Sequence, residues 1–536
     1  MRKVIAVASG TLLAAGLGAV APLNGAAAVN VDQDDNPAAV ARQFVKKNRA
    51  DVHGSPGDAY RVTDKITSGG DAAIRYERTY RGLPVLGGDF VVRVSENGQT
   101  EGLSVAQDRT IRVGTTPQIG KHAAKQQARR AATSASVRRV GKPRLVVDAR
   151  AGRPALAWQT VVRGMQADGQ TPSRQEVVTD ASTGKVRSAQ ETITTPIRIG
   201  QQTSPARHHG TGSEAAEAGT GTGIFVGEVP IDTTSTGSGF EMIDPSRGSS
   251  ETCDMNNTQF SCETFTDDDN AWGDGTNADR ASAAVDAHFG AATTYDYFTE
   301  VHGRNGIFGD GSGVPSRVHY GNEYANAFWD GQQMTYGDGA GNQNPLVEID
   351  VAGHEMSHGV TENTAGLEYS GDAGGLNEAT SDIFGTMVEF YADSPEDTPD
   401  FLIGELIDIN GDGTPLRYMD EPSKDGASYD CWSEEVPGSD PHYSSGVGNH
   451  FFFLLANGSG DSEYGTSPTC DGSTVTGIGN EKAASIWFTA LSEYMVSTET
   501  YAQAREHTVQ AATDLYGADS AEVAAVEAAW SAVSVS

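Results

Sequence analysis

Charge divides this sequence into two parts of opposite sign. Residues 1–195 carry 28 Lys and Arg against 17 Asp and Glu, a formal charge of +11, whereas residues 196–536 carry 10 against 55, a charge of -45. We therefore expect two bodies of opposite charge in one chain. At roughly 100–200 residues per domain, 536 residues correspond to about three domains. The total of -34 argues against nucleic acid as a partner, since a phosphate backbone requires a basic surface.

The first residues have the pattern of a secretory signal. Met1-Arg2-Lys3 is followed by an apolar stretch over 4–20 and by the small residues Gly25-Ala-Ala-Ala28. A membrane anchor is the alternative, but the apolar stretch is shorter than the roughly 20 residues that a span needs. We expect cleavage of residues 1–28 and a secreted, extracellular product with no membrane association afterwards.

The four cysteines all lie in the acidic part, and an even number fits an oxidising compartment. They allow three disulfide connectivities. We favour Cys253–Cys262 with Cys431–Cys470, because each of these pairs closes a local loop. Zinc binding by these cysteines is disfavoured, since they contain no C-x-x-C pair.

The pattern along the chain favours an α+β protein. Residues 29–195 look like two small α+β units with alternating strands at 76–85 and 89–94, a basic helix over 121–135, and strands at 145–147 and 155–158. Gln, Ser, Thr, Gly and Ala then dominate a stretch that indicates a linker. The expected division is 29–110 and 111–195 for the two units, 196–223 for the linker, 224–362 for a β-rich region ending in a helix, and 363–536 for a mainly helical region.

One segment carries the pattern of a metal site. His354-Glu355-Met-Ser-His358 has the H-E-x-x-H spacing, which places both imidazoles on one face of a helix within reach of a single Zn²⁺. A catalytic zinc requires three protein ligands and an open position. Glu378, twenty residues downstream, is the candidate third ligand, and Asp382 can hold the other ring nitrogen of a ligating histidine. A solvated acidic helix face is the alternative for these two carboxylates.

At this point the sequence resembles the thermolysin family of zinc metalloendopeptidases. The resemblance extends over about residue 220 to the C-terminus, in ordered segments at 326–329, 336–339, 354–358, 364–369, 377–382, 416–419 and 442–446. Residues 30–190 look like the two-part propeptide of that family, with Gly82-Leu-Pro-Val-Leu-Gly87 as the clearest segment. The resemblance implies a β-rich catalytic subdomain, a helical one, and an active-site cleft between them.

The resemblance also implies a role for individual residues. Zinc is bound by His354, His358 and Glu378, and Asp382 orients His354. Glu355 takes the proton of the attacking water and passes it to the leaving amine. Tyr369 and His442 donate to the developing oxyanion, with Asp440 orienting His442. The substrate backbone is bound by Asn326, Ala327 and Arg417. Val351, Ile403 and Leu416 form an apolar pocket for the residue just after the cut.

Calcium is the second metal that the resemblance implies. The matching carboxylates are Asp350, Glu389, Asp400 and Glu405, and hard cations favour such oxygen ligands. Leu402 stands where members with two calcium ions have a further carboxylate, so we expect one ion at this site. The segment 408–413 resembles the start of an EF-hand loop, but its twelfth position is Met419, and an Asx-rich turn is the preferred interpretation.

The expected protein is thus a secreted zinc endopeptidase that cleaves proteins and peptides before bulky apolar residues. It is expected to be a monomer, made as a zymogen whose propeptide inhibits it and assists its folding. A catalytically inactive binding protein on the same scaffold, and an independent inhibitor or binding module in the basic part, are the alternatives. Histidines outside the zinc site are expected to be packed or exposed and not ligands, namely His208, His209, His288, His319, His450 and His507.

Overall fold

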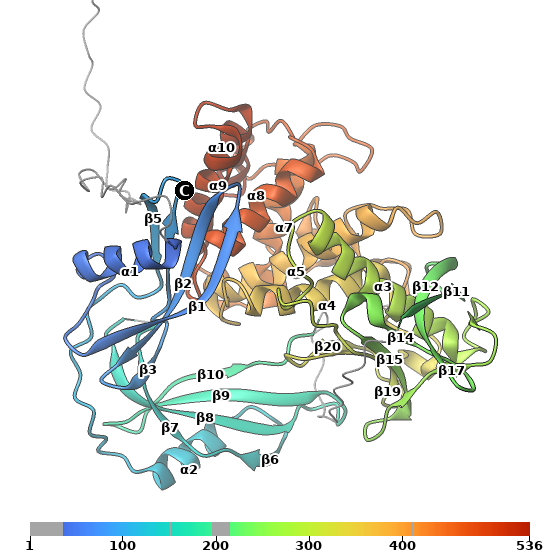
Figure 1. Cartoon of the computed structure of the whole chain (residues 1–536), viewed down its shortest axis with the longest axis horizontal. Coiled ribbons are helices and arrows are strands. Elements are labelled where there is room, and N and C mark those ends of the chain that lie inside the picture. The colour runs from blue at the N-terminus through green and yellow to red at the C-terminus, as the bar shows by residue number, and fades with distance from the viewer. Residues whose placement is uncertain (1–35, 151, 196–214, 410) are drawn as a thin grey trace, which may run out of the picture.

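The computed structural model describes residues 36–150, 152–195, 215–409 and 411–536 (Figure 1). The predicted signal peptide at 1–28 and the histidine pair at 208–209 lie outside the described residues, as does most of the predicted linker. Among the helices of the described ranges, none combines the length and the apolarity that crossing a bilayer requires.

The basic N-terminal part consists of two helices packed on a ten-stranded sheet. Its elements are α1 (Pro37–Lys47), β1 (Asp58–Ser68), β2 (Asp71–Tyr80), β3 (Leu83–Leu86), β4 (Phe90–Val94), β5 (Thr100–Val105), α2 (Lys121–Ala131), β6 (Ser136–Val140), β7 (Arg144–Asp148), β8 (Ala155–Met165), β9 (Pro172–Asp180) and β10 (Val186–Glu191). The strand order is β10-β9-β8-β7-β3-β2-β4-β5, with β1 beside β2 and β6 beside β8. A short parallel pair, β3 with β7, joins the two α+β halves.

Local sequence explains both helices. Asn36 caps α1, since its side chain accepts a hydrogen bond from the amide of Ala38. Apolar residues of α1, including Phe44, pack in one core with Tyr76 and Phe90 of the sheet. In α2 only Ala124 and Ala128 are buried, so the predicted exposed basic helix is present, although it ends at Ala131 and not at residue 135.

The β-rich region that follows contains two sheets, and both of them contact one long helix, α3. Its elements are β11 (Ala216–Thr222), β12 (Glu228–Thr236), β13 (Gly239–Glu241), β14 (Ile243–Asp244), β15 (Ser250–Thr258), β16 (Glu263–Thr264), β17 (Thr266–Asp267), β18 (Ala271–Trp272), α3 (Arg280–Glu300), β19 (Ser316–Tyr320), β20 (Ala327–Trp329), β21 (Met334–Tyr336) and α4 (Ile349–Glu362). One sheet has the order β17-β13-β12-β11-β18. The other has the order β14-β15-β19-β21-β20, with β16 beside β15.

The C-terminal region is mainly helical. Its elements are α5 (Gly371–Ala392), β22 (Leu402–Ile403), β23 (Arg417–Tyr418), α6 (Pro441–Ser444), α7 (Gly446–Asn457), α8 (Asn480–Glu493), α9 (Tyr501–Tyr516) and α10 (Ala521–Ala532). Single 3-10 turns lie at Pro245–Arg247, Ala340–Asn342, Pro422–Asp425 and Val436–Gly438. One apolar core extends from Val226 to Val535 and joins both regions, with the buried rings of Trp329, Trp487 and Trp530 in it.

The predicted linker extends too far toward the C-terminus. Residues 216–222 form β11, which pairs in antiparallel register with β12 and in parallel with β18. The Gly- and Thr-rich composition resembles a linker, but the glycines are required by close packing: a Cβ on Gly221 would lie 2.6 Å from a methyl carbon of Val285 on α3. The composition therefore reflects a closely packed strand.

The basic part lies along the acidic part and contacts both of its regions (Figure 1). The hairpin β1–β2 lies beside α8 and α9, where Arg75 of β2 donates hydrogen bonds to backbone carbonyls at the end of α8. At the other end, the turn between β8 and β9 reaches the β-rich region, and the side chain of Gln170 hydrogen-bonds the backbone of Asn322.

Candidate active site

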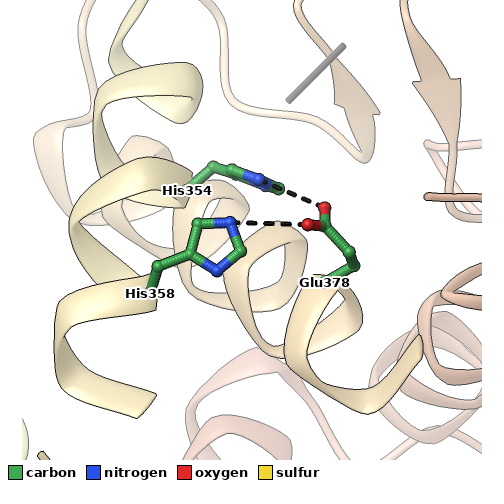
Figure 2. Close-up of side chains that lie close together, drawn as sticks. All are labelled: His354, His358 and Glu378. Atoms are coloured by element: carbon green, nitrogen blue, oxygen red, sulfur yellow. Dashed lines mark ion pairs between the residues drawn. The ribbon is translucent and has the colours of Figure 1, made fainter. Parts of the chain in front are cut away.

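Helices α4 and α5 bring the three candidate zinc ligands together. His354 and His358 lie one turn apart on α4, and Glu378 faces them from α5 (Figure 2). The distance from His354 Nε2 to Glu378 Oε2 is 3.5 Å, and that from His358 Nε2 to Glu378 Oε1 is 3.6 Å. All three side chains are buried and their ligand atoms lie within 4.8 Å of one another.

Two glycines allow the helices to approach closely enough. A Cβ on Gly385 of α5 would lie 2.4 Å from the carbonyl oxygen of Asp350, and one on Gly353 would lie 3.0 Å from the Cα of Gly385. Any larger residue at Gly385 would push α5 away from α4. The two glycines thus fix the distance between the histidines and Glu378.

The other ring nitrogen of each histidine is already hydrogen-bonded, which leaves its Nε2 atom for a metal ion. His354 Nδ1 contacts Asp382 Oδ1 at 2.7 Å, and His358 Nδ1 contacts Asn377 Oδ1 at 2.7 Å. His354 Nε2, His358 Nε2 and Glu378 Oε2 are buried and have no hydrogen-bond partner in the described part of the chain. Three unsatisfied, converging donor atoms of this kind match the N and O ligands of Zn²⁺.

Burial also sets the protonation of the ligands. Desolvation lowers the pKa of His354 and brings that of His358 to about 4, so both rings are neutral near pH 7, as a metal ligand must be. Burial alone would raise the pKa of Asp382, but Arg417 and His354 outweigh it and hold that pKa far below its usual range. Asp382 is therefore a permanent anion that orients His354.

Arg417 contacts this carboxylate directly. Its Nε and Nη2 atoms donate to Asp382 Oδ2 and Oδ1 at 2.8 and 2.6 Å. Asn449 Nδ2 donates to Oδ2 of the same carboxylate at 2.8 Å. The guanidinium that was predicted to bind substrate is thus also part of the network behind the zinc ligands. Asn377 and Asn449 belong to this network and were not predicted as site residues, although Asn377 lies in a segment that resembles the family.

Glu355 lies on α4 between the two histidines in sequence and is fully buried. Burial and the nearby charge of Glu378 raise its pKa well above the usual value. Both of its carboxylate oxygens are unsatisfied in the described structure. A buried carboxylate with free acceptor positions beside a metal site has the properties of a general base.

The two candidate oxyanion donors, Tyr369 and His442, lie next to Glu378, and Asp440 lies next to His442. The hydroxyl of Tyr369 donates to Glu378 Oε1 and lies 3.3 Å from His442 Nε2. His442 Nδ1 lies 2.7 Å from Asp440 Oδ1, and Asp440 also caps α6. Burial lowers the pKa of His442, but the carboxylates of Glu378 and Asp440 outweigh it and the net pKa is raised. The arrangement favours a charged imidazolium.

The predicted substrate-binding residues lie along the edge of β20 and around β22. Asn326 is fully buried, and its side-chain oxygen accepts a hydrogen bond from the amide of Ala327 at 3.0 Å. Val351 and Ile403 are buried. The amide of Leu416 donates to the carbonyl of Ile403 at 2.7 Å. Val351 of α4 and Ile403 of β22 thus belong to the same apolar core, and Leu416 is bonded to Ile403 through the backbone.

The predicted calcium carboxylates gather around the C-terminal end of α5 and the loops that flank β22. Glu389, Asp400 and Glu405 form one group of close carboxylate oxygens. Asp350 lies beside them, and burial together with its charge raises the pKa of Glu389 to about 12 and that of Glu405 to about 9. Unsatisfied buried oxygens on Glu389 and Glu405 fit a hard cation.

Two further carboxylates join this cluster and were missed. Glu348 and Asp397 form a second group with Glu405, and each has a buried oxygen without a partner in the described chain. Glu348 precedes α4 and Asp397 lies in the loop after α5, so their approach depends on the packing of α4 against α5. Neither has a signal in the sequence apart from its acidity.

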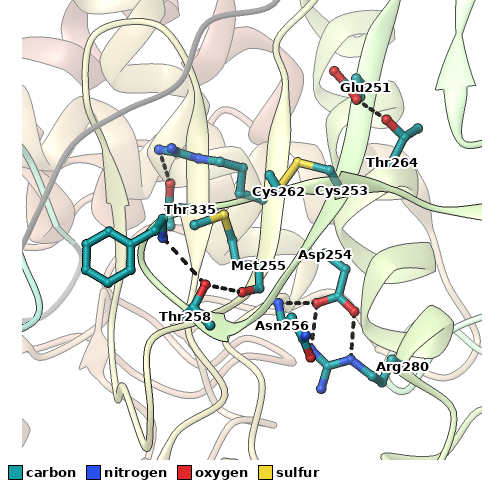
Figure 3. Close-up of a disulfide and its surroundings, with 12 residues drawn as sticks. Glu251, Cys253, Asp254, Met255, Asn256, Thr258, Cys262, Thr264, Arg280 and Thr335 are labelled. Carbon is teal, nitrogen blue, oxygen red and sulfur yellow. Dashed lines mark hydrogen bonds and ion pairs between the residues drawn. A yellow bond between two sulfur atoms is a disulfide. The ribbon is translucent and has the colours of Figure 1, made fainter.

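Both disulfides have the local pairing that was predicted. Cys253 bonds to Cys262 between β15 and the start of β16, and Cys431 bonds to Cys470. Figure 3 shows the first of them next to the ion pair of Asp254 with Arg280, which connects β15 to α3.

The four described histidines that were expected not to be ligands are buried and hydrogen-bonded, and they lie outside the groups of residues that could hold a metal ion. His288 contacts Thr252, and His507 contacts Glu499. The remaining two, His319 and His450, contact Asp338 and Ser467.

The end of the basic part enters the site. Thr194 forms a bridge with Trp329 of β20, and the carbonyl of Thr195 accepts a hydrogen bond from His442 Nε2. Since a carbonyl only accepts, and Asp440 accepts at Nδ1, both ring nitrogens of His442 carry hydrogen in this state. No sequence pattern predicted this contact between residues far apart in the chain.

Comparison with known proteins identifies three regions of the chain. Residues 218–362 match the catalytic domain of thermolysin metallopeptidases, residues 365–535 match their alpha-helical domain, and residues 58–105 match the fungalysin/thermolysin propeptide motif.

Relatives cover these regions to different extents. A transglutaminase-activating metalloprotease of Streptomyces mobaraensis is 50% identical over 86% of this chain and 59% of its own length. A bacillolysin of Bacillus cereus is 44% identical over 60% of this chain and 55% of its own. The chain thus spans less than two thirds of these two relatives. A thermolysin of Alicyclobacillus acidocaldarius is 36% identical over 94% of this chain and 91% of its own length. Together with the buried His, His and Glu ligand set, these matches show that the chain belongs to the thermolysin family of metallopeptidases.

Proposed function

We propose that this chain is the precursor of a secreted zinc endopeptidase that cleaves peptide bonds before bulky apolar residues. The observation that carries the proposal is the convergence of His354, His358 and Glu378 with three buried, unpartnered donor atoms. We infer one catalytic zinc ion there. Bound zinc acidifies a water molecule and polarises the carbonyl to be cut.

The protein's own residues carry the proton and the charge. Glu355 accepts the proton of the attacking water and delivers it to the leaving nitrogen. Tyr369 and the charged ring of His442 donate hydrogen bonds to the oxygen that becomes negative. Asp440 holds His442 in orientation and stabilises its charge, at the 2.7 Å contact.

Substrate binding is assigned to the residues around β20 and β22. We infer that Asn326 and Ala327 bind the substrate backbone at the edge of β20, while Arg417 binds a carbonyl. The apolar lining from Val351, Ile403 and Leu416 is inferred to accept the side chain that follows the cut. A bulky apolar residue gains most from such a lining.

We also propose that at least one calcium ion binds at the carboxylate cluster. Asp350, Glu389, Asp400 and Glu405 are the proposed ligands, and the structure adds Glu348 and Asp397 as candidates. Buried carboxylates this close repel one another, and a divalent cation removes that repulsion. The ion would tie the start of α4 to the end of α5.

Residues 29–195 are proposed to be the propeptide, which inhibits the enzyme and assists its folding. It reaches the catalytic residues through the contact of Thr195 with His442. We place the processing bond between 196 and 215, because a cut within β11 would separate paired residues of a sheet. Removal of 1–28 and of the propeptide would leave a monomeric, extracellular enzyme.

The experiment is to purify the secreted form and determine its N-terminal sequence, its zinc content and its cleavage of peptides with and without a chelator. We expect one zinc per chain, loss of cleavage on chelation, and recovery with added zinc. Cleavage that persists in zinc-free protein would contradict the proposal.

A further inference from the structure

The segment 193–195 lies in the cleft as an extended peptide on the edge of β20. The amide of Thr194 donates to the carbonyl of Trp329 at 3.3 Å, and the amide of Trp329 donates to the carbonyl of Thr194 at 3.1 Å. This exchange of both backbone hydrogen bonds adds a strand to a sheet edge, which is a general mode of peptide binding. It shows where a bound peptide has its backbone.

The contact of Thr195 sets the register of that peptide. Its carbonyl oxygen accepts from Nε2 of His442, the ring proposed to stabilise the oxyanion. The carbonyl of Thr195 therefore stands at the position of the carbonyl to be cut, and Ile193 occupies the position two residues before it. In an extended strand, the side chains of Ile193 and Thr195 point to the face opposite that of Thr194.

Ile193 is enclosed in an apolar pocket that the proposed mechanism does not use. Only 4% of its surface is exposed, and it packs in a cluster with Met255, Tyr320, Tyr324 and Phe328, each at most 3% exposed. Edge-to-face contacts fix the walls, because the ring of Tyr320 lies 5.2 Å from that of Tyr324 and 5.3 Å from that of Phe328. We call these four residues the Ile193 pocket.

The propeptide closes the Ile193 pocket from a second side. The hydroxyl of Tyr320 donates to the carbonyl of Gln170 at 2.8 Å, and that of Tyr324 lies 2.6 Å from the hydroxyl of Thr171. On the enzyme side, Cys262 of the first disulfide packs against the cluster. The four wall residues belong to the catalytic part, whereas Ile193 belongs to the propeptide. Removal of the propeptide would therefore leave the pocket in place and empty it of Ile193.

We propose that the Ile193 pocket is a specificity pocket of the mature enzyme, which accepts an aliphatic side chain two residues before the residue whose carbonyl is cut. The inference rests on the proposed endopeptidase function and names a second selected position in its substrates. A substrate with a branched aliphatic residue there would bury it as Ile193 is buried now, and a glycine would leave the aromatic walls exposed. A pocket of this kind discriminates by about tenfold or more.

The test is a set of peptides with one fixed cleavage site and Ile, Val, Gly or Asp two residues before the cut carbonyl. We expect kcat/KM to be about tenfold or more higher for Ile than for Gly, and lowest for Asp. The same exchange one residue further from the cut should change kcat/KM less than threefold. Equal rates for Ile and Gly would overturn the inference and leave the endopeptidase proposal intact. Absence of any cleavage would contradict the endopeptidase proposal itself.

Two variants assign the preference to the pocket. Met255→Ala removes one wall, and Met242→Ala removes a methionine that is equally buried in the main core of the catalytic part. We expect the Ile-to-Gly ratio of kcat/KM to fall severalfold in M255A and to stay unchanged in M242A. Because the ratio is measured within one enzyme preparation, partial loss of folded protein does not affect it. An unchanged ratio in M255A would overturn the assignment.

Discussion

Glu355 combines deep burial with a carboxylate that has no protein partner for either oxygen in the described structure. An unsatisfied buried carboxylate destabilises the fold, so stability does not explain why a glutamate stands at this position. A role in the reaction does. The zinc ligands next to it depend on separate atoms of His354, His358 and Glu378. Metal binding and proton transfer can therefore be separated by substitution.

We expect Glu355→Ala to keep zinc and to lose activity by about 10²–10⁴-fold, the range that general acid–base catalysis contributes. Zinc content and kcat/KM on one peptide are the measurements. Glu527→Ala, at an exposed position of α10, is the control and should retain both. Near-normal activity of E355A would show that another group transfers the proton.

The residues of the zinc site were largely predictable, and the reason is geometric. The i, i+4 spacing on a helix fixes which side chains share a face, so His354 and His358 follow from the sequence. The role of Asn377 is harder to predict, because its contact with His358 depends on how α5 packs against α4. Glu348 and Asp397 have no local pattern at all, since only tertiary packing directs them to Glu405.

The carboxylate cluster that we propose to bind calcium joins the start of α4, the end of α5 and the loops on both sides of β22. Burial and neighbouring carboxylates raise the pKa of Asp350 to about 8, that of Glu405 to about 9 and that of Glu389 to about 12. Without a cation, the folded chain keeps protons that the unfolded chain loses above about pH 4. The free energy of unfolding of the calcium-free protein therefore falls as pH rises from about 5 to 8.

Bound calcium should offset this loss of stability at high pH, because it binds the ionised carboxylates. We expect the rise in Tm on adding calcium to be several degrees larger at pH 8 than at pH 5. The measurement is thermal unfolding with calcium and with a calcium-selective chelator at both pH values. Glu405→Gln should reduce the rise, whereas Glu434→Gln, at an exposed loop position, should not. A rise that is equal at the two pH values would contradict this linkage.

Arg75 of the propeptide contacts the end of α8. Arg75 donates to the carbonyls of Leu491, Ser492 and Met495 at 2.6–3.0 Å, and the guanidinium is buried. Carbonyls at a helix C-terminus have no partners within the helix and carry partial negative charge, so a guanidinium suits them. The hydrogen bonds of Arg75 reach the end of α8 and not the candidate catalytic residues, so its effect on inhibition can be tested separately from the active site.

We expect Arg75→Ala to weaken inhibition of the mature enzyme by the separate propeptide about 30-fold or more, since truncating one partner of a buried charged contact costs about 2 kcal/mol or more. Arg61→Ala removes an exposed arginine of β1 that pairs with Glu77 of β2, and should change inhibition little. Circular dichroism of both propeptide variants checks that they fold. Equal inhibition constants for the two variants would exclude Arg75 as an anchor.

The helix α2 and the strand β4 lie close to where they were predicted, since the expected basic helix was 121–135 and the expected strand was 89–94. The prediction failed at β11, because its glycines and threonines are required by packing against α3 and by the sheet, and composition alone resembles a linker there. The binding of segment 193–195 in the cleft could also not be predicted from the sequence. Its partners Trp329 and His442 are distant in the chain, and only the assembled fold brings them to one place.

The two parts of the chain carry opposite net charge. After loss of Arg2 and Lys3 with the predicted signal peptide, the propeptide carries about +9 against -45 for residues 196–536. Specific pairs add to this field, such as Arg93 with Glu493 at 3.2 Å and Arg150 with Glu368 at 3.5 Å. Buried apolar contacts, such as that of Ile193, respond little to salt, so the two kinds of contact can be told apart by ionic strength.

We expect the separately expressed segment 29–195 to inhibit the mature enzyme, and its inhibition constant to rise about tenfold or more between low salt and 1 M salt. Salt screens the long-range attraction, because the Debye length falls from about 30 Å at 0.01 M to about 3 Å at 1 M. The measurement is the inhibition constant across this range, with the enzyme's activity on a neutral peptide at each salt concentration as the control. Inhibition that does not depend on salt would assign the affinity to the apolar and backbone contacts at the cleft. Absence of inhibition at low salt would contradict the inhibitory role of residues 29–195 as an independent unit.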